Sequence, residues 1–131
     1  MKNKKTIQVR ITLLGEEGSG KTEVFKRFVY EKNDNLASAS IGIDYETKII
    51  KYKNKRYNIT IQDTSGEERF RGLVKSYYHF SDGFFIFFDL TNEHTLSSVH
   101  SFIESIEEEL VDPKIIILGT KDEESNEKKN S

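Results

Sequence analysis

The sequence contains no cysteine, and its only proline is Pro113. Without cysteine there is no disulfide framework, which fits a reducing compartment, and there is no site for a prenyl or palmitoyl group. Because Lys2 stands where myristoylation requires glycine, we expect no lipid anchor on this chain. We therefore expect a cytoplasmic protein that reaches a membrane surface only through partners.

Long apolar runs are also absent. No run is long enough to cross a bilayer, and the lysines near the amino terminus are not followed by the apolar core of a signal peptide. A chain of 131 residues can bury roughly two thirds of its surface, enough for a real core. We expect a single domain over residues 1–131, with frayed tails at 1–5 and 124–131.

Neither sign of charge dominates. The chain carries 20 basic and 22 acidic residues, and the two signs are mixed along the sequence. This argues against nucleic acid as a partner. The three histidines are scattered and no internal repeat is visible, so the sequence supports neither a zinc site nor a catalytic triad.

One stretch carries clear chemistry. Residues 15–22 read GEEGSGKT, which matches the pattern G-x-x-x-x-G-K-T in full. In this pattern successive backbone N–H groups form a concavity for phosphates at a helix N-terminus. Lys21 can reach the β- and γ-phosphates, and Thr22 offers a hydroxyl to Mg²⁺.

The residues around this loop decide whether the match is meaningful, because an ordinary glycine-rich turn would also fit eight residues. The motif needs a strand before it and a helix after it. Apolar and polar residues alternate from Ile7 to Leu13, as in a strand, and Phe25 and Phe28 recur at helical spacing after the loop. The order is therefore strand, loop and helix.

Further elements follow along the chain. Residues 33–40 are small and polar and indicate a loop, and residues 44–53 and 55–62 indicate a hairpin with its tip at 53–55. The run FFIFF at 84–88 predicts a central strand covered on both faces. Residues 115–118 predict a short buried strand. Two helices are expected, one soft helix near 70–78 and one from about Thr95 to before Pro113, whose apolar stripe is Leu96, Val99, Ile103, Ile106 and Leu110.

Strands that alternate with helices predict an α/β fold with a mostly parallel, doubly wound sheet and one antiparallel edge strand. Ligands of such folds bind beyond the carboxyl ends of the strands. Three clusters are expected there: the phosphate loop at 15–22, the run DTSG at 63–66 and the run GTKDE at 119–123. Asp63 at a strand end suits Mg²⁺ held through water, although an ordinary Asp-Gly turn is the alternative.

With these residues in hand, the chain resembles the small GTPases of the Ras superfamily, and the Rab family most of all. The resemblance runs from about Ile7 to Glu123. Its markers are the phosphate loop, SIGIDY at 40–45, DTSGEERF at 63–70, the pair Tyr77 and Tyr78, FFDLTNE at 87–93 and ILGTKDE at 117–123. The resemblance implies a P-loop GTPase fold and a guanine-nucleotide switch that uses GTP, GDP and Mg²⁺.

The resemblance also implies roles for single residues. Thr22 and Ser40 correspond to the hydroxyl ligands of Mg²⁺, with Asp63 acting through water. Gly66 corresponds to the residue whose N–H meets the γ-phosphate. The implied nucleotide-binding residues are Gly15, Glu17, Gly18, Ser19, Gly20, Lys21, Thr22, Gly66, Thr120, Lys121 and Glu123. Exchange factor, GTPase-activating protein and effector are implied partners, through residues 40–45 and 62–78.

Several positions depart from the family pattern. Glu67 replaces the glutamine that orients the attacking water, and an ionised glutamate only accepts hydrogen bonds. Glu17 adds a second acid beside the phosphates, so we expect slow hydrolysis with Glu67 and Lys21 as the catalytic residues. Glu123 replaces the aspartate that pairs with guanine, which weakens the implied base selectivity. Gln62 replaces a tryptophan that, with Tyr45 and Tyr77, would form an aromatic surface for effectors.

The family pattern continues after Lys121 with a further helix, a sixth strand and a last helix, which this sequence lacks. We therefore expect a C-terminally truncated version of the fold in which an apolar flank of the sheet is exposed. Two other functions remain open. One is a non-catalytic nucleotide-binding or scaffold module, which the three glutamates favour. The other is a P-loop kinase, against which the hairpin and DTSGEE argue.

Overall fold

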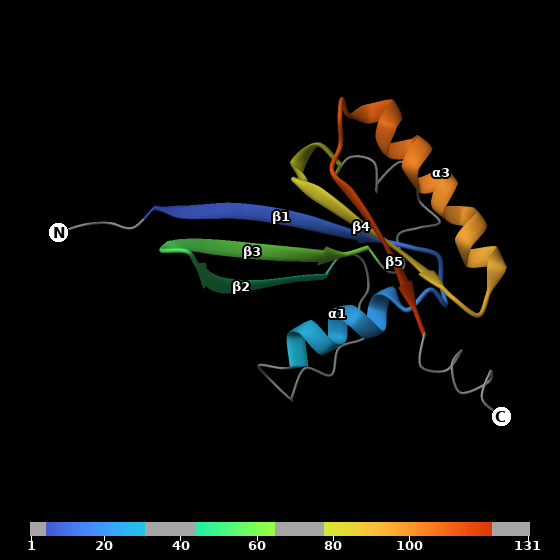
Figure 1. Cartoon of the computed structure of the whole chain (residues 1–131), viewed down its shortest axis with the longest axis horizontal. Helices are drawn as coiled ribbons and strands as arrows, with labels where there is room; N and C mark the ends of the chain where they lie inside the picture. Colours follow the sequence, from blue (N-terminus) through green and yellow to red (C-terminus); the bar gives the residue numbers. More distant parts are fainter. Residues whose placement is uncertain (1–4, 31–43, 65–77, 122–131) are drawn as a thin grey trace.

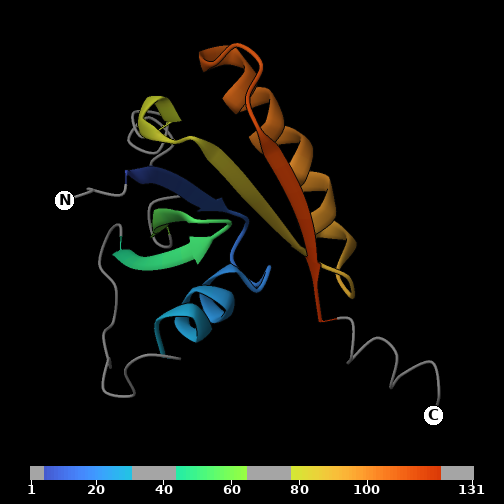
Figure 2. The same ribbon diagram turned by 60° about the vertical axis from the view of Figure 1, so that its left-hand side comes forward.

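The computed structural model describes residues 5–30, 44–64 and 78–121. Five strands and two helices lie in this part of the chain, with one short 3-10 turn (Figures 1 and 2). In chain order the elements are β1 (Thr6–Leu14), α1 (Lys21–Tyr30), β2 (Asp44–Tyr52), β3 (Lys55–Asp63), η1 (Tyr78–Phe80), β4 (Gly83–Asp89), α3 (Glu93–Glu109) and β5 (Ile115–Thr120). None of the helices in these ranges is long and apolar enough to span a bilayer.

The strands form one sheet in the order β2-β3-β1-β4-β5. All neighbours are parallel except β2 and β3, so β2 is the antiparallel edge strand that the sequence predicts. Helices α1 and α3 lie on opposite faces of the sheet (Figure 1). This arrangement confirms the mostly parallel, doubly wound α/β fold expected from the alternation of strands and helices.

Two clusters of apolar side chains form the core, one on each face of the sheet. Successive residues of a strand point to opposite faces, so Leu13 joins the cluster with Phe25 of α1 and Leu14 joins the cluster beneath α3. Strand β4 divides in the same way between Ile86 and Phe87. The prediction of a central strand covered on both faces is confirmed.

The hairpin of β2 and β3 turns on two residues. Lys53 and Asn54 have φ of 49° and 63°, which matches the twist of a two-residue hairpin turn. The sequence pattern predicts that Lys55 also belongs to the tip. Lys55 instead pairs with Tyr52 as the first residue of β3, because a two-residue turn of this type leaves both flanking residues in the ladder.

The predicted apolar stripe of α3 is confirmed for Val99, Ile103, Ile106 and Leu110, which lie in the core beneath the helix or pack against it, and is wrong for Leu96. Leu96 is 47% exposed, and the buried residues of the helix are Thr95, Val99, Phe102, Ser105 and Ile106. The helix also begins two residues before Thr95, at Glu93, because the Asn92 side chain accepts a hydrogen bond from the His94 N–H and caps it. The Thr95 hydroxyl accepts a hydrogen bond from the Asp89 N–H at 2.8 Å. This bond turns Thr95 inward and therefore turns Leu96 outward.

Strand β5 is not the buried strand that its composition suggests. It lies at the edge of the sheet, with β4 as its neighbour, and Ile116 and Ile117 are 53% and 47% exposed. Consecutive residues face opposite sides of a strand, so both faces of this edge present an isoleucine. The expectation of an exposed apolar flank holds for the described residues.

Candidate functional site

The loop at residues 15–22 connects the carboxyl end of β1 to the first residues of α1. Two of its glycines are required by close contacts. A Cβ at Gly15 would lie 2.5 Å from the Ser19 Oγ, and a Cβ at Gly20, where φ is 95°, would lie 2.8 Å from the Thr120 Oγ1. The loop therefore packs against the end of β5 so closely that a side chain at Gly20 would separate the two.

Lys21 is the most unusual residue of the loop, because its side chain is a buried cation. It is 4% exposed, and its Nζ lies 3.9 Å from the Asp63 Oδ1 and 3.5 Å from the Thr64 Oγ1. Burial lowers the pKa of Lys21 from 10.5 to about 8, while the attraction of Asp63 opposes that shift. An ammonium held in this way at the start of a helix is well placed to bind an anion.

Asp63 lies at the carboxyl end of β3, opposite Leu13 in the parallel ladder with β1. The register thus brings the start of the DTSG run to the phosphate loop, and Thr64 fixes the junction by donating a hydrogen bond from its hydroxyl to the Leu13 carbonyl at 2.9 Å. Asp63 and Thr22 both carry oxygen atoms, which are the ligands that Mg²⁺ prefers. The other expected residues of this side, Ser40, Gly66 and Glu67, lie outside the described residues.

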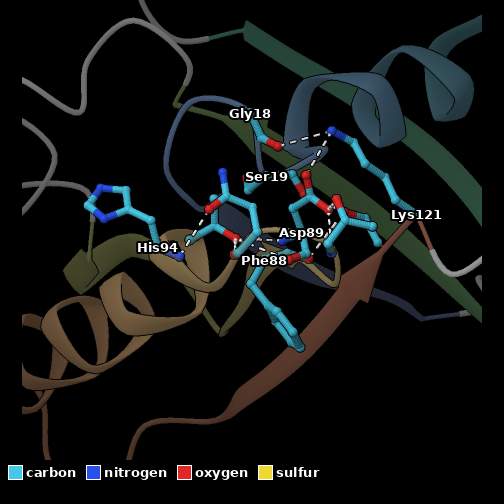
Figure 3. Close-up of polar contacts among 10 residues, drawn as sticks. Gly18, Ser19, Phe88, Asp89, His94 and Lys121 are labelled. Carbon is cyan, nitrogen blue, oxygen red and sulfur yellow. Dashed lines mark hydrogen bonds and ion pairs between the residues drawn. The ribbon is translucent and has the colours of Figure 1, made fainter. Parts of the chain in front are cut away.

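The end of β5 contacts the same loop from the other side (Figure 3). The Thr120 Oγ1 donates to the Ser19 carbonyl at 2.6 Å, and the Lys121 Nζ donates to the Gly18 carbonyl at 3.4 Å. The two residues expected beside a base and the residues expected around phosphates are therefore brought together. Glu123, the third residue expected on the base side, lies outside the described residues.

Asp89 lies between the phosphate loop and the base-side residues through its contact with Lys121, and the sequence pattern assigns it no role. Its Oδ2 lies 3.0 Å from the Lys121 Nζ (Figure 3), and the carboxylate is almost fully buried at the end of β4. Hydrogen bonds from the Thr91 hydroxyl and N–H, followed by the Lys121 ammonium, lower the pKa of Asp89 to about 2. The signal was an acidic residue that ends a buried strand at the edge where ligands bind.

The two acids of the loop differ in their surroundings. Glu17 is exposed, whereas the Glu16 carboxylate lies 3.4 Å from the His94 Nε2 at the start of α3. The Ser19 Oγ of the same loop is buried and has no hydrogen-bond partner among the described residues. The Glu17 carboxylate can therefore turn into water, whereas the Glu16 carboxylate is held beside His94.

The expected effector surface needs a correction. Gln62 is 1% exposed, because its side chain turns inward and donates to the Thr12 Oγ1 at 3.2 Å. Tyr78 is buried as well and packs edge to face on Phe84, with ring centroids 5.4 Å apart. Tyr45 is 51% exposed and remains available, and Tyr77 lies outside the described residues. Gln62 and Tyr78, the two ends of the segment 62–78, are therefore too buried to contact a partner.

Comparison with known proteins agrees with this geometry. A sequence model of the Ras family matches residues 10–130. Ras-related protein Rab-8A of Bos taurus is 35% identical over 113 residues, which cover 86% of this chain and 55% of that protein. Ras-related protein Rab-22A of Homo sapiens is 34% identical over 99 residues, which cover 76% of this chain and 51% of that protein. The chain thus spans about half the length of the curated relatives it matches, and it belongs to the Ras family as a Rab-like small GTPase.

Proposed function

We propose that this chain is a guanine-nucleotide switch of the Rab type, which binds GTP and GDP with Mg²⁺ and hydrolyses GTP slowly. The observation that carries the proposal is Lys21. Its ammonium is buried in a glycine-rich loop at the start of α1, with the Asp63 carboxylate 3.9 Å away. A phosphate bound to the loop would compensate this charge more fully than Asp63 does, because the loop also directs backbone N–H groups towards an anion.

The described residues that would hold the nucleotide lie in this loop or contact it. The phosphates would be held by Gly15, Glu17, Gly18, Ser19, Gly20, Lys21, Thr22 and Gly66, and the base by Thr120, Lys121 and Glu123. For Glu17 and Ser19 this contact would be through the backbone, since the Glu17 carboxylate would repel a phosphate and the Ser19 Oγ is buried below the loop. The fit is supported by the contacts of Thr120 and Lys121 with the loop carbonyls.

Mg²⁺ would be held by oxygen atoms of Thr22, Ser40 and Asp63. The cation, when bound, neutralises charge on the phosphates. Asp63 is buried 3.9 Å from the Lys21 ammonium, so its carboxylate lies beside the place where the phosphates would bind. The donor set of hydroxyl and carboxylate oxygens suits Mg²⁺ better than softer metals.

Slow hydrolysis is proposed from two acids. Glu67 cannot donate a hydrogen bond when ionised, and Glu17 places a further negative charge on the loop. A single-turnover GTP assay checks this. The substitution Glu67→Gln is expected to raise the rate about tenfold or more, because it restores a group that both accepts and donates. An unchanged rate in that variant would contradict the proposed role of Glu67.

By its family the chain would act with an exchange factor, a GTPase-activating protein and an effector, in vesicle traffic or signalling. Residues 40–45 would carry the effector contact, and exposed Tyr45 supports that position. The inward position of Gln62 and Tyr78 leaves residues between them as the second contact. These partners would bring the chain to endomembranes.

A non-catalytic module is the second candidate, and one observation favours it. Ile116 and Ile117 expose an apolar edge that a scaffold could use to bind a protein, independently of turnover. The two functions differ in their nucleotide requirement. A module of this kind would bind its partner equally well with and without nucleotide.

Nucleotide binding is the experiment that tests the proposal. Fluorescent GDP is titrated with Mg²⁺ into the chain and into the variants Lys21→Met and Lys26→Met, with unlabelled GDP and ADP as competitors. Lys26 is exposed on the same helix and serves as the control. We expect saturable binding that GDP displaces better than ADP and that only Lys21→Met abolishes. Absence of binding to the unmodified chain, or equal binding by Lys21→Met, would refute the proposal.

A further inference from the structure

Three strand ends at the far side of the sheet form a structure that the nucleotide site does not use. Residues 5–9, at the start of β1, and residues 49–58 of the hairpin extend beyond the rest of the fold (Figure 1), and we call them the basic arm. Strand β1 pairs with β3 from Thr6 onwards but with β4 only from Ile11 onwards. The arm is therefore a three-stranded extension at the amino ends of β1 and β3, opposite the phosphate loop.

All charges of the basic arm have one sign. Its fifteen residues include no aspartate and no glutamate, and its cations are Lys5, Lys51, Lys53, Lys55 and Arg56. The ladder brings these residues together, because Arg56 pairs with Lys51 on one side and Thr6 on the other. The four lysines are exposed. Although the whole chain has mixed charge, the fold gathers five cations at one end.

Exposed apolar side chains accompany these cations. Ile49 is 60% exposed, Ile50 is 43% exposed and Tyr52 is 59% exposed. Adjacent residues of β2 face opposite sides of the strand, so each face of the arm presents an apolar group within a basic surface. The Lys53 ammonium lies 5.4 Å from the centroid of the Tyr52 ring, which places a cation beside the exposed aromatic.

We propose that the basic arm binds the anionic surface of a lipid bilayer. Lysines attract acidic headgroups, and a tyrosine with neighbouring isoleucines suits the boundary between headgroups and acyl chains. A bilayer is favoured over a folded partner because the cations surround a projecting ribbon with apolar groups on both faces and no pocket is needed. The charge of the rest of the fold supports the orientation: α3, on β4 away from the hairpin, carries five glutamates and no lysine or arginine.

This attachment leaves the nucleotide site accessible. Residues 10–14 of β1 lie between the arm and the phosphate loop, and they span ~17 Å at about 3.3 Å per residue. The inference does not rest on the proposed nucleotide switch, since it uses none of the residues of that site. Membrane binding and nucleotide binding are therefore measured separately.

Vesicle co-sedimentation tests the proposal. The chain is mixed with phosphatidylcholine vesicles that contain phosphatidylserine, or with phosphatidylcholine alone. The variant K5Q/K51Q/K55Q leaves the turn residue Lys53 in place, and K5R/K51R/K55R keeps the charge. The variant K26Q/R27Q/K114Q removes three exposed cations elsewhere. We expect the glutamine variant of the arm to bind about a hundredfold more weakly, from about fivefold per lysine, or ~1 kcal/mol each.

Several results decide the outcome. The arginine variant and the control are expected to bind vesicles as the unmodified chain does. High salt is expected to release the unmodified chain from the vesicles, and this salt dependence tests the proposal even if the glutamine variant does not fold. Equal binding to uncharged vesicles or full binding by the glutamine variant of the arm would overturn the proposal. The proposal would also be overturned if the chain failed to bind vesicles but bound duplex RNA or an acidic protein in a salt-sensitive way.

Discussion

The buried cation of the phosphate loop leads to a prediction about stability that separates function from folding. Lys21→Met is expected to stabilise the nucleotide-free protein. The pKa of Lys21 is lowered from 10.5 to about 8, and this difference corresponds to about 3 kcal/mol at about 1.4 kcal/mol per pH unit. The attraction of Asp63 already enters that pKa, so its loss is not subtracted a second time. The figure is an upper estimate, because the folded state can relax around the charge.

The pH dependence follows from the same pKa. Because the pKa of Lys21 is lower in the folded state, the unfolded state binds more protons between about pH 8 and 10.5. The contribution of Lys21 to the free energy of unfolding therefore rises with pH through this window. The destabilisation is fully present below about pH 8 and is relieved near pH 10.5.

Chemical denaturation of the nucleotide-free protein measures both effects. Nucleotide is removed with a chelator and a phosphatase, and the unmodified chain, Lys21→Met and the exposed control Lys26→Met are compared at pH 7 and pH 10. We expect Lys21→Met to be more stable than the unmodified chain at pH 7 by up to about 3 kcal/mol and the difference to shrink at pH 10. A lower stability of Lys21→Met at pH 7, or a difference that grows with pH, would refute the argument from burial.

Three further predictions concern the contacts of the loop. Asp89→Asn keeps an acceptor for Thr91 but removes the charge that holds Lys121, so stopped-flow release of fluorescent GDP is expected to be about tenfold faster. The control Asp82→Asn, next to the other end of β4, is expected to leave the release rate unchanged. Equal release rates for both variants would contradict the role of Asp89. Ser19→Ala removes a buried hydroxyl that has no partner among the described residues, so the nucleotide-free protein is expected to gain about 1 kcal/mol in urea denaturation, and a loss of stability would contradict this. Gly18→Ala and Gly20→Ala both place a side chain at positive φ, but only the Cβ at residue 20 would meet the Thr120 side chain, at 2.8 Å. Gly20→Ala is therefore expected to lower the thermal midpoint more than Gly18→Ala. Equal midpoints would show that the contact with β5 is unimportant.

Local patterns were sufficient to predict the elements that carry the loop. The alternation in β1, the motif at 15–22 and the apolar run in β4 each specify one element from neighbouring residues alone, and their order specifies a parallel sheet. The contacts of Thr120 and Lys121 with the phosphate loop could also be predicted, because the carboxyl ends of parallel strands lie at one edge of a sheet.

Contacts between distant residues limited the rest. Leu96 and Thr95 fit a helical stripe about equally well, and the bond between Thr95 and Asp89 decides which turns inward. The analogy with a tryptophan predicts Gln62 at the surface, but its amide reaches Thr12, its partner on the neighbouring strand β1. Four of the five cations of the arm lie within residues 51–56, but only the pairing of Thr6 with Arg56 shows that Lys5 joins them.

The most direct test of the central proposal is the identity of the small molecule that the chain retains through purification. Residues 1–131 are purified in the presence of Mg²⁺, the protein is denatured, and the released nucleotide is identified by chromatography and mass spectrometry. A switch built on Lys21, Thr120 and Lys121 predicts close to one GDP or GTP per chain, with none in Lys21→Met. An adenine nucleotide, or a folded chain without nucleotide that also fails to bind added GDP, would contradict the proposal.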